Sequence, residues 1–73
     1  MEKITFDDFK NDVMSSLLFK PKGWRDGQTI FNYIDCKYGV ARYVQFEDGV
    51  DCFYNDDVID EFILASYNVI ERL

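Results

Sequence analysis

Apolar residues recur at helical spacing in three stretches of the chain. Between residues 5 and 20 they occupy the i, i+3, i+4 and i+7 positions of a helix with one buried side. That side consists of Phe6, Phe9, Val13 and Leu17, with Met14 and Leu18 beside it. Thr5 suits the N-cap, and Asp8 follows three residues later, as in a capping box. Because Pro21 disfavours helical angles at Lys20, we predict that the first helix ends there.

A second stripe predicts a helix over residues 24–36. Its inward face consists of Trp24, Gly27 or Gln28, Phe31 and Ile34, with Ile30 beside them. Gly27 lies inside this helix, where glycine costs about 1 kcal/mol relative to alanine, so we expect another helix to approach closely there. Gly39 suits a left-handed cap. This helix is predicted to be the most buried, with Trp24 and Phe31 against the first and last helices.

The third stripe predicts a C-terminal helix. Asn55 or Asp56 suits its N-cap, and further acidic residues fill its first turns, where the helix dipole favours negative charge. Its apolar face consists of Val58, Ile59, Phe62, Ile63, Ser66, Ile70 and Leu73, widened by Tyr67 and Val69.

Residues 40–54 fit two structures. Val40, Tyr43 and Val44 could form the inward side of a short helix, with Phe46 as a further candidate for that side. The same stretch is rich in β-branched and aromatic residues, and the turn at residues 47–49 would suit a hairpin. Periodicity in so short a window does not separate the two, and propensity alone leans toward the hairpin.

Size and composition favour one folded domain over residues 1–73. Seven Phe, five Tyr and one Trp supply the core. They exceed what so short a chain encloses, because small domains bury only about 60% of their surface. Some aromatic side chains must therefore be exposed.

The net charge of −6, from 14 acidic and 8 basic residues, argues against general binding to nucleic-acid phosphates. Lys20, Lys22 and Arg25 are too few to change that. The acidic balance favours a soluble protein, or one that meets a basic partner surface. The sequence contains no apolar signal region and no membrane span. We therefore expect a cytoplasmic protein without a membrane partner, in which Cys36 and Cys52 are reduced and buried.

Candidate chemistry is sparse. The chain has no histidine, so its cysteines lack their commonest general base, and no phosphate-binding loop is present. Asp48, Asp51 and residues 55–57 are rich in oxygen ligands but do not follow the spacing of a calcium loop. We predict no catalytic residues, no cofactor and no metal site.

Two motifs nevertheless resemble a known pattern. Residues 24–32, WRDGQTIFN, resemble Trp-Arg-x-Gly-Gln-x-x-Phe-Asn, and residues 51–59, DCFYNDDVI, resemble Asp-Pro-Phe-Tyr-x-Asp-x-x-Ile. The two patterns occur together in short, functionally uncharacterised proteins encoded by bacteriophages, prophages and their hosts. Cys52 departs from that family's proline. The resemblance implies an all-helical fold in a bacterial cell, and it shifts residues 40–54 from hairpin to short helix. We therefore predict an all-α bundle of three longer helices plus a short third element, with a hairpin at about 42–54 as the alternative.

Arg25, Gln28 and Asn32 form a polar row on one flank of the second helix. They could be a recognition surface, since Arg is common at interface hot spots. We favour a structural role, in which Gln28 and Asn32 bond the turn at residues 51–54 and Arg25 pairs with an acid of the last helix.

These observations favour a non-enzymatic phage or mobile-element accessory protein that acts through protein–protein contact. The predicted partner surface consists of Phe53, Tyr54, Asp57 and Glu61, with Arg25 nearby. The alternative for this surface is that Phe53 belongs to the core and Tyr54 only covers it. The alternative functions are a structural part of a virion or homo-oligomeric assembly and, more weakly, an acidic mimic of nucleic acid. The protein partner is unidentified, and both a monomer and a homo-oligomer remain open.

Overall fold

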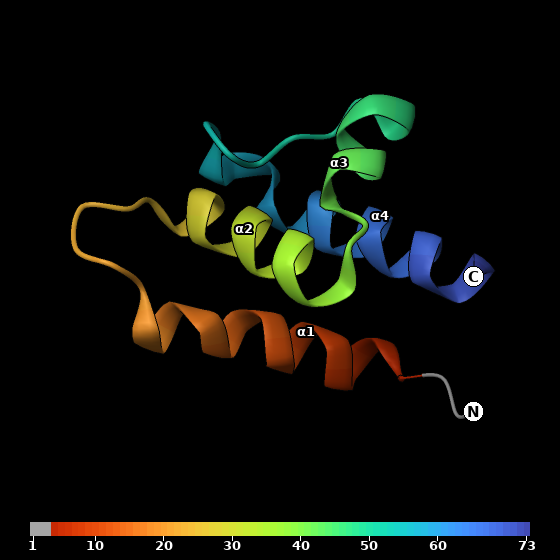
Figure 1. The fold of residues 1–73 in the computed structure, drawn as a ribbon, viewed down its shortest axis with the longest axis horizontal. Coiled ribbons are helices and arrows are strands. Elements are labelled where there is room, and N and C mark those ends of the chain that lie inside the picture. The colour runs from red at the N-terminus through yellow and green to blue at the C-terminus, as the bar shows by residue number, and fades with distance from the viewer. Residues whose placement is uncertain (1–3) are drawn as a thin grey trace.

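Residues 4–73 fold into four α-helices and three short helical turns (Figure 1). The computed structural model describes residues 4–73. Its elements, in chain order, are α1 (Phe6–Ser15), η1 (Ser16–Phe19), α2 (Asp26–Tyr38), α3 (Ala41–Tyr43), η2 (Val44–Asp48), η3 (Asp56–Val58) and α4 (Ile59–Arg72). η1 and η3 are 3₁₀ turns, and η2 is a π-helical turn. The prediction of an all-α fold with a short third element is confirmed. The hairpin alternative is wrong, because the described residues contain no strand.

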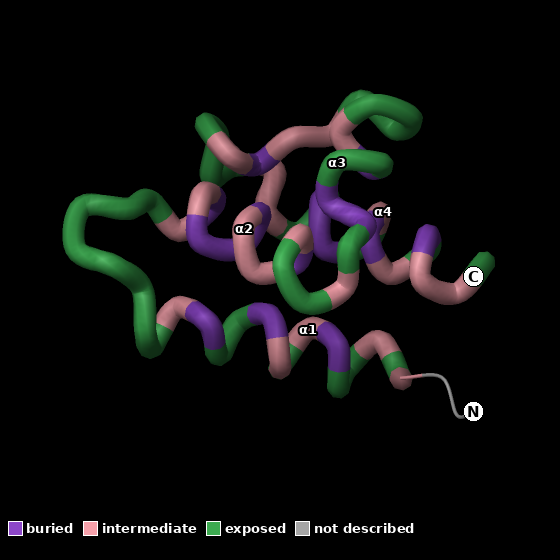
Figure 2. Tube along the Cα trace, in the orientation of Figure 1, coloured by how far each residue is buried: buried purple, intermediate pink, exposed green. Residues whose placement is uncertain are grey.

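α1, α2 and α4 pack against one another, and α3 with η2 covers the side of α2 away from α1 (Figure 1). Figure 2 shows buried segments on the facing sides of these helices. The completely buried large side chains are Phe9, Val13, Ile30, Ile34, Val44, Phe62 and Ile63. No helix within residues 4–73 is long and apolar enough to cross a bilayer.

The first helix begins as predicted, and its end differs. The Thr5 hydroxyl accepts a hydrogen bond from the Asp8 backbone N–H at 3.2 Å. After Ser15 the chain tightens into η1, where each residue advances by about 120° instead of 100°. Leu18 consequently leaves the apolar stripe and is 81% exposed. The expectation that Met14 and Leu18 border the buried face is wrong, since both are exposed.

The second helix begins at Asp26, two residues later than predicted. Gly23 has φ of +90° and Arg25 is extended, so Trp24 lies in the connection before the helix and is 37% exposed. The predicted packing of Trp24 in the buried face of this helix is therefore wrong. The helix also continues to Tyr38, beyond the predicted end. Gly39 is the expected left-handed cap, at φ of +72°.

α2 nevertheless has the most buried face, as predicted. Its buried residues are Gly27, Thr29, Ile30, Phe31 and Ile34. Phe31 packs on Phe62 of α4 with 5.4 Å between ring centroids, which confirms that contact.

Candidate functional site

The two motifs lie together and bond each other through backbone atoms. The Gly27 N–H donates to Oδ1 of Asp56 at 2.9 Å, and the Cys52 thiol donates to the Gly27 carbonyl at 3.2 Å. A Cβ added at Gly27 would lie 2.0 Å from the Cys52 carbonyl oxygen. Glycine is therefore required by the loop backbone after η2, and not by another helix as the sequence suggested.

Asp56 supplies the N-terminal cap that α2 lacks locally. Arg25, at the N-cap position, makes no capping hydrogen bond with its side chain. Because the first N–H groups of a helix have no partner within it, the Asp56 carboxylate satisfies one of them from a distant part of the chain. Asn55 caps the following turn instead, accepting from the Asp57 N–H at 3.0 Å. The two predicted N-cap candidates of the last helix therefore cap different elements. Asn55 caps η3, and Asp56 caps α2.

The polar row on α2 joins this contact only through Arg25. Its Nη2 donates to the Phe53 carbonyl at 3.3 Å, and its guanidinium lies 5.3 Å from the Tyr54 ring centroid, within cation–π range. The predicted ion pair between Arg25 and an acid of the last helix is wrong. Gln28 and Asn32 make no side-chain hydrogen bond to the turn within residues 4–73, so their predicted role is also wrong.

Aromatic rings form a continuous row from the core to the surface beside this contact. The centroids of Phe31 and Phe53 are 5.6 Å apart, and those of Phe53 and Tyr54 are 4.7 Å apart, both edge to face. Tyr54 is 77% exposed at the outer end, whereas Phe62 is completely buried at the inner end. Phe53 is half-buried between them, so it belongs to both the core and the surface.

These rings form one wall of an open groove of about 350 Å³. The opposite wall comes from α3 and η2. The lining residues are Phe31, Arg42, Gln45, Phe46, Phe53 and Tyr54, and we call this the aromatic groove. Phe46 is 82% exposed although it is fully apolar, which leaves a large hydrophobic side chain in water at the rim.

η2 is held in the position that turns Phe46 outward. Asp51 accepts from the Gln45 amide at 2.6 Å and from the Phe53 N–H at 2.8 Å, so it ties η2 to the turn that follows. Gly49, at φ of +69°, ends η2 in the left-handed region. The two hydrogen bonds of the Asp51 carboxylate therefore hold the two walls of the groove together.

Five carboxylates lie close in sequence to residues that line the aromatic groove, and none of them has a bonding partner within residues 4–73. The side chains of Glu47, Asp48, Asp57, Asp60 and Glu61 are exposed, and within residues 4–73 they make no hydrogen bond or ion pair. The two arginines beside the groove are engaged: Arg25 with Phe53 and Tyr54, and Arg42 with Asp35 at 3.7 Å. We call the five carboxylates the free acids.

The predicted partner surface is only partly assembled. Phe53, Tyr54 and Arg25 lie together, as the motifs suggested. Asp57 and Glu61 are exposed on η3 and α4 but do not line the aromatic groove. Sequence analysis missed Phe46, because an aromatic residue in an ambiguous segment was assigned to the inside by its apolarity. The residues 47–49 that follow it, acidic and ending in glycine, were the available signal for a surface turn.

The described residues contain no group of three His, Cys, Asp or Glu side chains positioned to hold a metal ion. The cysteines differ from the expectation that both are buried. Cys52 is buried, and that burial, aided by nearby Asp51, raises the pKa of its thiol to about 12. Cys36 is exposed on α2.

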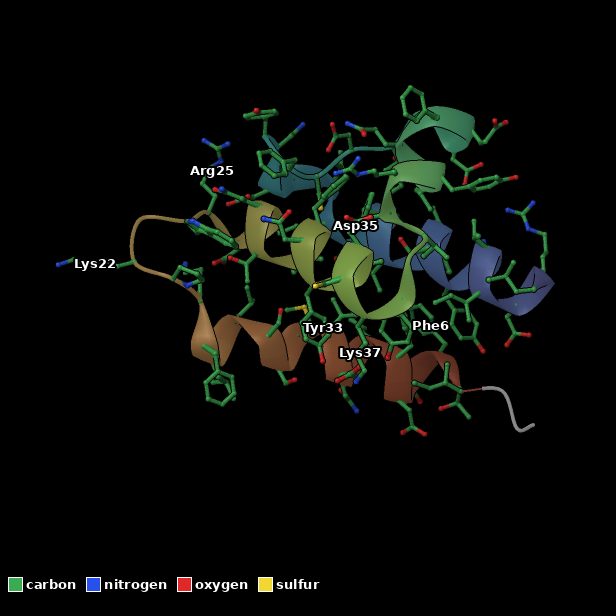
Figure 3. All side chains as sticks on the ribbon, in the orientation of Figure 1. Phe6, Lys22, Arg25, Tyr33, Asp35 and Lys37 are labelled. Carbon is green, nitrogen blue, oxygen red and sulfur yellow. The ribbon has the colours of Figure 1, made fainter. Side chains whose placement is uncertain are left out.

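A second polar cluster joins α1 to α2 on the other side of the molecule. The Asp12 carboxylate accepts from the Tyr33 hydroxyl at 2.8 Å, from the Lys37 ammonium at 2.8 Å and from the Tyr38 hydroxyl at 2.5 Å. Figure 3 shows Tyr33 and Lys37 directed from α2 toward α1. Burial alone would raise the pKa of Asp12, but the three hydrogen bonds outweigh it and lower that pKa. This cluster holds two helices together.

Comparison with known proteins finds no match for this chain among family models, curated protein sequences or solved structures.

Proposed function

We propose that this chain is a non-enzymatic accessory protein that acts by binding another protein in the aromatic groove. The observation that carries the proposal is Phe46, 82% exposed at the rim of a groove whose far wall is Phe53 and Tyr54. Exposed aromatic side chains around a concave apolar surface are typical anchors for a partner. The setting in bacteriophages or other mobile elements is supported by the motif resemblance alone.

The free acids define the partner's chemistry. Carboxylates without a partner stay hydrated in the isolated protein and complement a basic surface. We therefore propose a partner segment that presents Lys or Arg beside apolar side chains. Its apolar groups would enter the aromatic groove, and its basic groups would lie over Glu47 and Asp48, which directly follow Phe46.

A titration followed by NMR tests this proposal. The probe is a short peptide of lysine, leucine and phenylalanine, and the control peptide has glutamate in place of lysine. We expect saturable shifts at Phe46, Phe53 and Tyr54 with the basic peptide only, weakening as salt is added. Shifts that never saturate, or that centre elsewhere on the molecule, would contradict the proposal.

Two matched variants separate groove binding from general attraction between charges. Phe46→Ala should weaken binding about tenfold, the usual loss for an aromatic anchor. Phe19→Ala, which removes an equally exposed ring outside the groove, should leave binding unchanged. A chain that mimics nucleic acid would bind basic partners by charge alone. In that case Phe46→Ala would also have no effect.

A further inference from the structure

The connection between α1 and α2 exposes apolar and basic side chains together. Every residue from Leu18 to Arg25 is exposed, and Figure 2 shows this stretch as one continuous exposed segment. Leu18 is 81% and Phe19 is 85% exposed, and Trp24 follows five residues later. The segment also holds three of the eight basic residues, Lys20, Lys22 and Arg25, and no acid. We call residues 18–25 the tip.

The tip protrudes from the body of the molecule. It lies at one end of the longest axis and extends beyond the ends of both helices (Figure 1). Lys22 points away from the body of the molecule (Figure 3), and it has no bonding partner within the described part of the chain. Lys20 forms a surface ion pair with Asp26 at 2.7 Å, which exchanges readily for another anion.

The two aromatic residues of the tip line the same hollow. Phe19 and Trp24 line one shallow hollow of about 250 Å³, together with Ser16, Thr29, Asn32 and Tyr33. Pro21 and Gly23 fix the connection between them, with Gly23 at φ of +90°. Phe19 and Trp24 therefore border the same hollow, Leu18 is exposed next to Phe19 in sequence, and Lys20 and Lys22 lie between the two rings in sequence.

We infer that the tip binds the surface of an anionic lipid bilayer, with Leu18, Phe19 and Trp24 entering the interface and Lys20 and Lys22 contacting lipid phosphates. Aromatic and aliphatic side chains flanked by lysine are the elements of interfacial anchoring. A narrow protrusion of eight residues is much smaller than the roughly 20–30 residues that each side of a standard protein interface supplies, whereas a bilayer accepts a few inserted side chains. The inference is independent of the aromatic groove.

Local charge permits this contact although the chain is acidic overall. Exposed charges separated by more than about 8 Å are largely screened at physiological ionic strength. The approach to a bilayer is therefore governed by the basic tip more than by the net charge of −6. The inference departs from the expectation of no membrane partner, which considered only segments that cross a bilayer.

Trp24 provides a built-in test, because it is the only tryptophan of the chain. The experiment adds vesicles of phosphatidylcholine containing about one-quarter phosphatidylglycerol, and vesicles of phosphatidylcholine alone, to the intact protein. We expect the Trp24 emission to shift to the blue and to become protected from acrylamide with the anionic vesicles. High salt should reverse the shift.

Variants at exposed positions assign the effect to the tip. The double variant Leu18→Ser, Phe19→Ser should abolish the shift while its melting temperature stays within a few degrees of wild type, as is usual for surface changes. Phe46→Ser, at an equally exposed ring outside the tip, should bind vesicles like wild type. Lys22→Gln should weaken vesicle binding about fivefold, the typical share of one lysine at an anionic surface.

Three results would overturn the inference. The first is an unchanged Trp24 spectrum with anionic vesicles in excess. The second is a blue shift that grows with protein concentration without lipid, accompanied by a dimer in light scattering, which would make the tip a contact between copies of the chain. The third is an equal shift with soluble polyglutamate, which would make the partner an acidic protein.

Discussion

Charged side chains are used differently in the two parts of the chain. Residues 1–42 carry seven basic and six acidic side chains, whereas residues 43–73 carry one basic and eight acidic side chains. The three ion pairs between described residues all lie in the first part, where Asp12, Asp26 and Asp35 each pair with a lysine or arginine side chain. In the second part the free acids form no ion pair with any residue from 4 to 73.

The difference separates charges that fix the fold from charges available to a partner. A half-buried carboxylate that accepts three hydrogen bonds, as Asp12 does, stabilises the packing of two helices. An exposed carboxylate without a partner contributes little, apart from the dipole effect at a helix N-terminus. Four of the six residues that line the aromatic groove, Gln45, Phe46, Phe53 and Tyr54, belong to the second part, which also carries the free acids.

The contact between the two motifs should be the most sensitive point. Gly27→Ala would place a methyl group 2.0 Å from the Cys52 carbonyl and 2.8 Å from the Asp56 carboxylate. We expect a loss of about 3 kcal/mol or more in the free energy of unfolding, because backbone must move to admit it. Urea denaturation measures this loss.

Gly49→Ala is the matched control for that variant. Gly49 has open space around it, but its φ of +69° strains any other residue. We expect a loss of about 1–2 kcal/mol there. If the two variants were equally stable, close backbone approach would not be the reason for glycine at position 27.

Asp12→Asn should have the next largest effect. It removes the charge that three donors share, and hydrogen bonds to a charged group each contribute about 1.5–3 kcal/mol. Because an amide oxygen still accepts, we expect a net loss of about 2 kcal/mol in urea denaturation. A loss under about 0.5 kcal/mol would be no larger than that of an ordinary surface substitution. It would contradict the claim that the Asp12 carboxylate stabilises the fold while the free acids do not.

The same cluster predicts the pH dependence of stability. The pKa of Asp12 is lowered in the folded protein, so its contribution is present above the unfolded value near 3.8 and is lost as the pH falls through the folded value. Burial and the Asp12 carboxylate raise the pKa of Tyr38 to about 12, so that contribution is lost as the pH rises from 10 toward 12. Thermal melts should show both decreases in wild type. Asp12→Asn should reduce them.

Ser66 offers a smaller change of opposite sign. Its hydroxyl is completely buried in α4 and has no hydrogen-bond partner among the described residues. Since a buried hydroxyl without a partner is unfavourable, Ser66→Ala should raise the free energy of unfolding by up to about 1 kcal/mol. A destabilised variant would indicate that the hydroxyl is bonded in solution.

The free acids should have the smallest effect on stability. Replacing Glu47 and Glu61 by Gln, and Asp48 and Asp57 by Asn, removes four charges at once. Relief of repulsion opposes a modest dipole loss near the start of α4, so we expect a total change within about 1 kcal/mol. Urea denaturation beside Asp12→Asn makes the comparison direct.

The sequence predicts the three long helices because their apolar stripes persist over several turns. Thr5 and Gly39 mark ends that local chemistry decides, whereas α1 gives way to a 3₁₀ turn at Ser16, before Pro21 is reached. The start of α2 could not be read in this way, since its cap comes from Asp56, 29 residues beyond Gly27. The outward position of Phe46 was equally hidden, because it depends on the bonds of Asp51 and on the π-helical turn.

One measurement tests whether the free acids are dispensable for the fold and whether they meet the partner. It is the urea midpoint of the wild type and of the quadruple variant, in which Glu47, Asp48, Asp57 and Glu61 are neutralised, each with and without the basic probe peptide. A ligand that binds only the folded state raises its free energy of unfolding by RT ln(1 + L/Kd), where L is the concentration of free ligand, so the rise grows with affinity and with ligand concentration. We predict that the peptide raises the urea midpoint of the wild type. Without peptide, the quadruple variant should be as stable as the wild type, and adding the peptide should not raise its midpoint. A variant that loses more than about 2 kcal/mol by itself would show that the free acids support the fold. A variant that gains as much as wild type would show that they do not meet the partner.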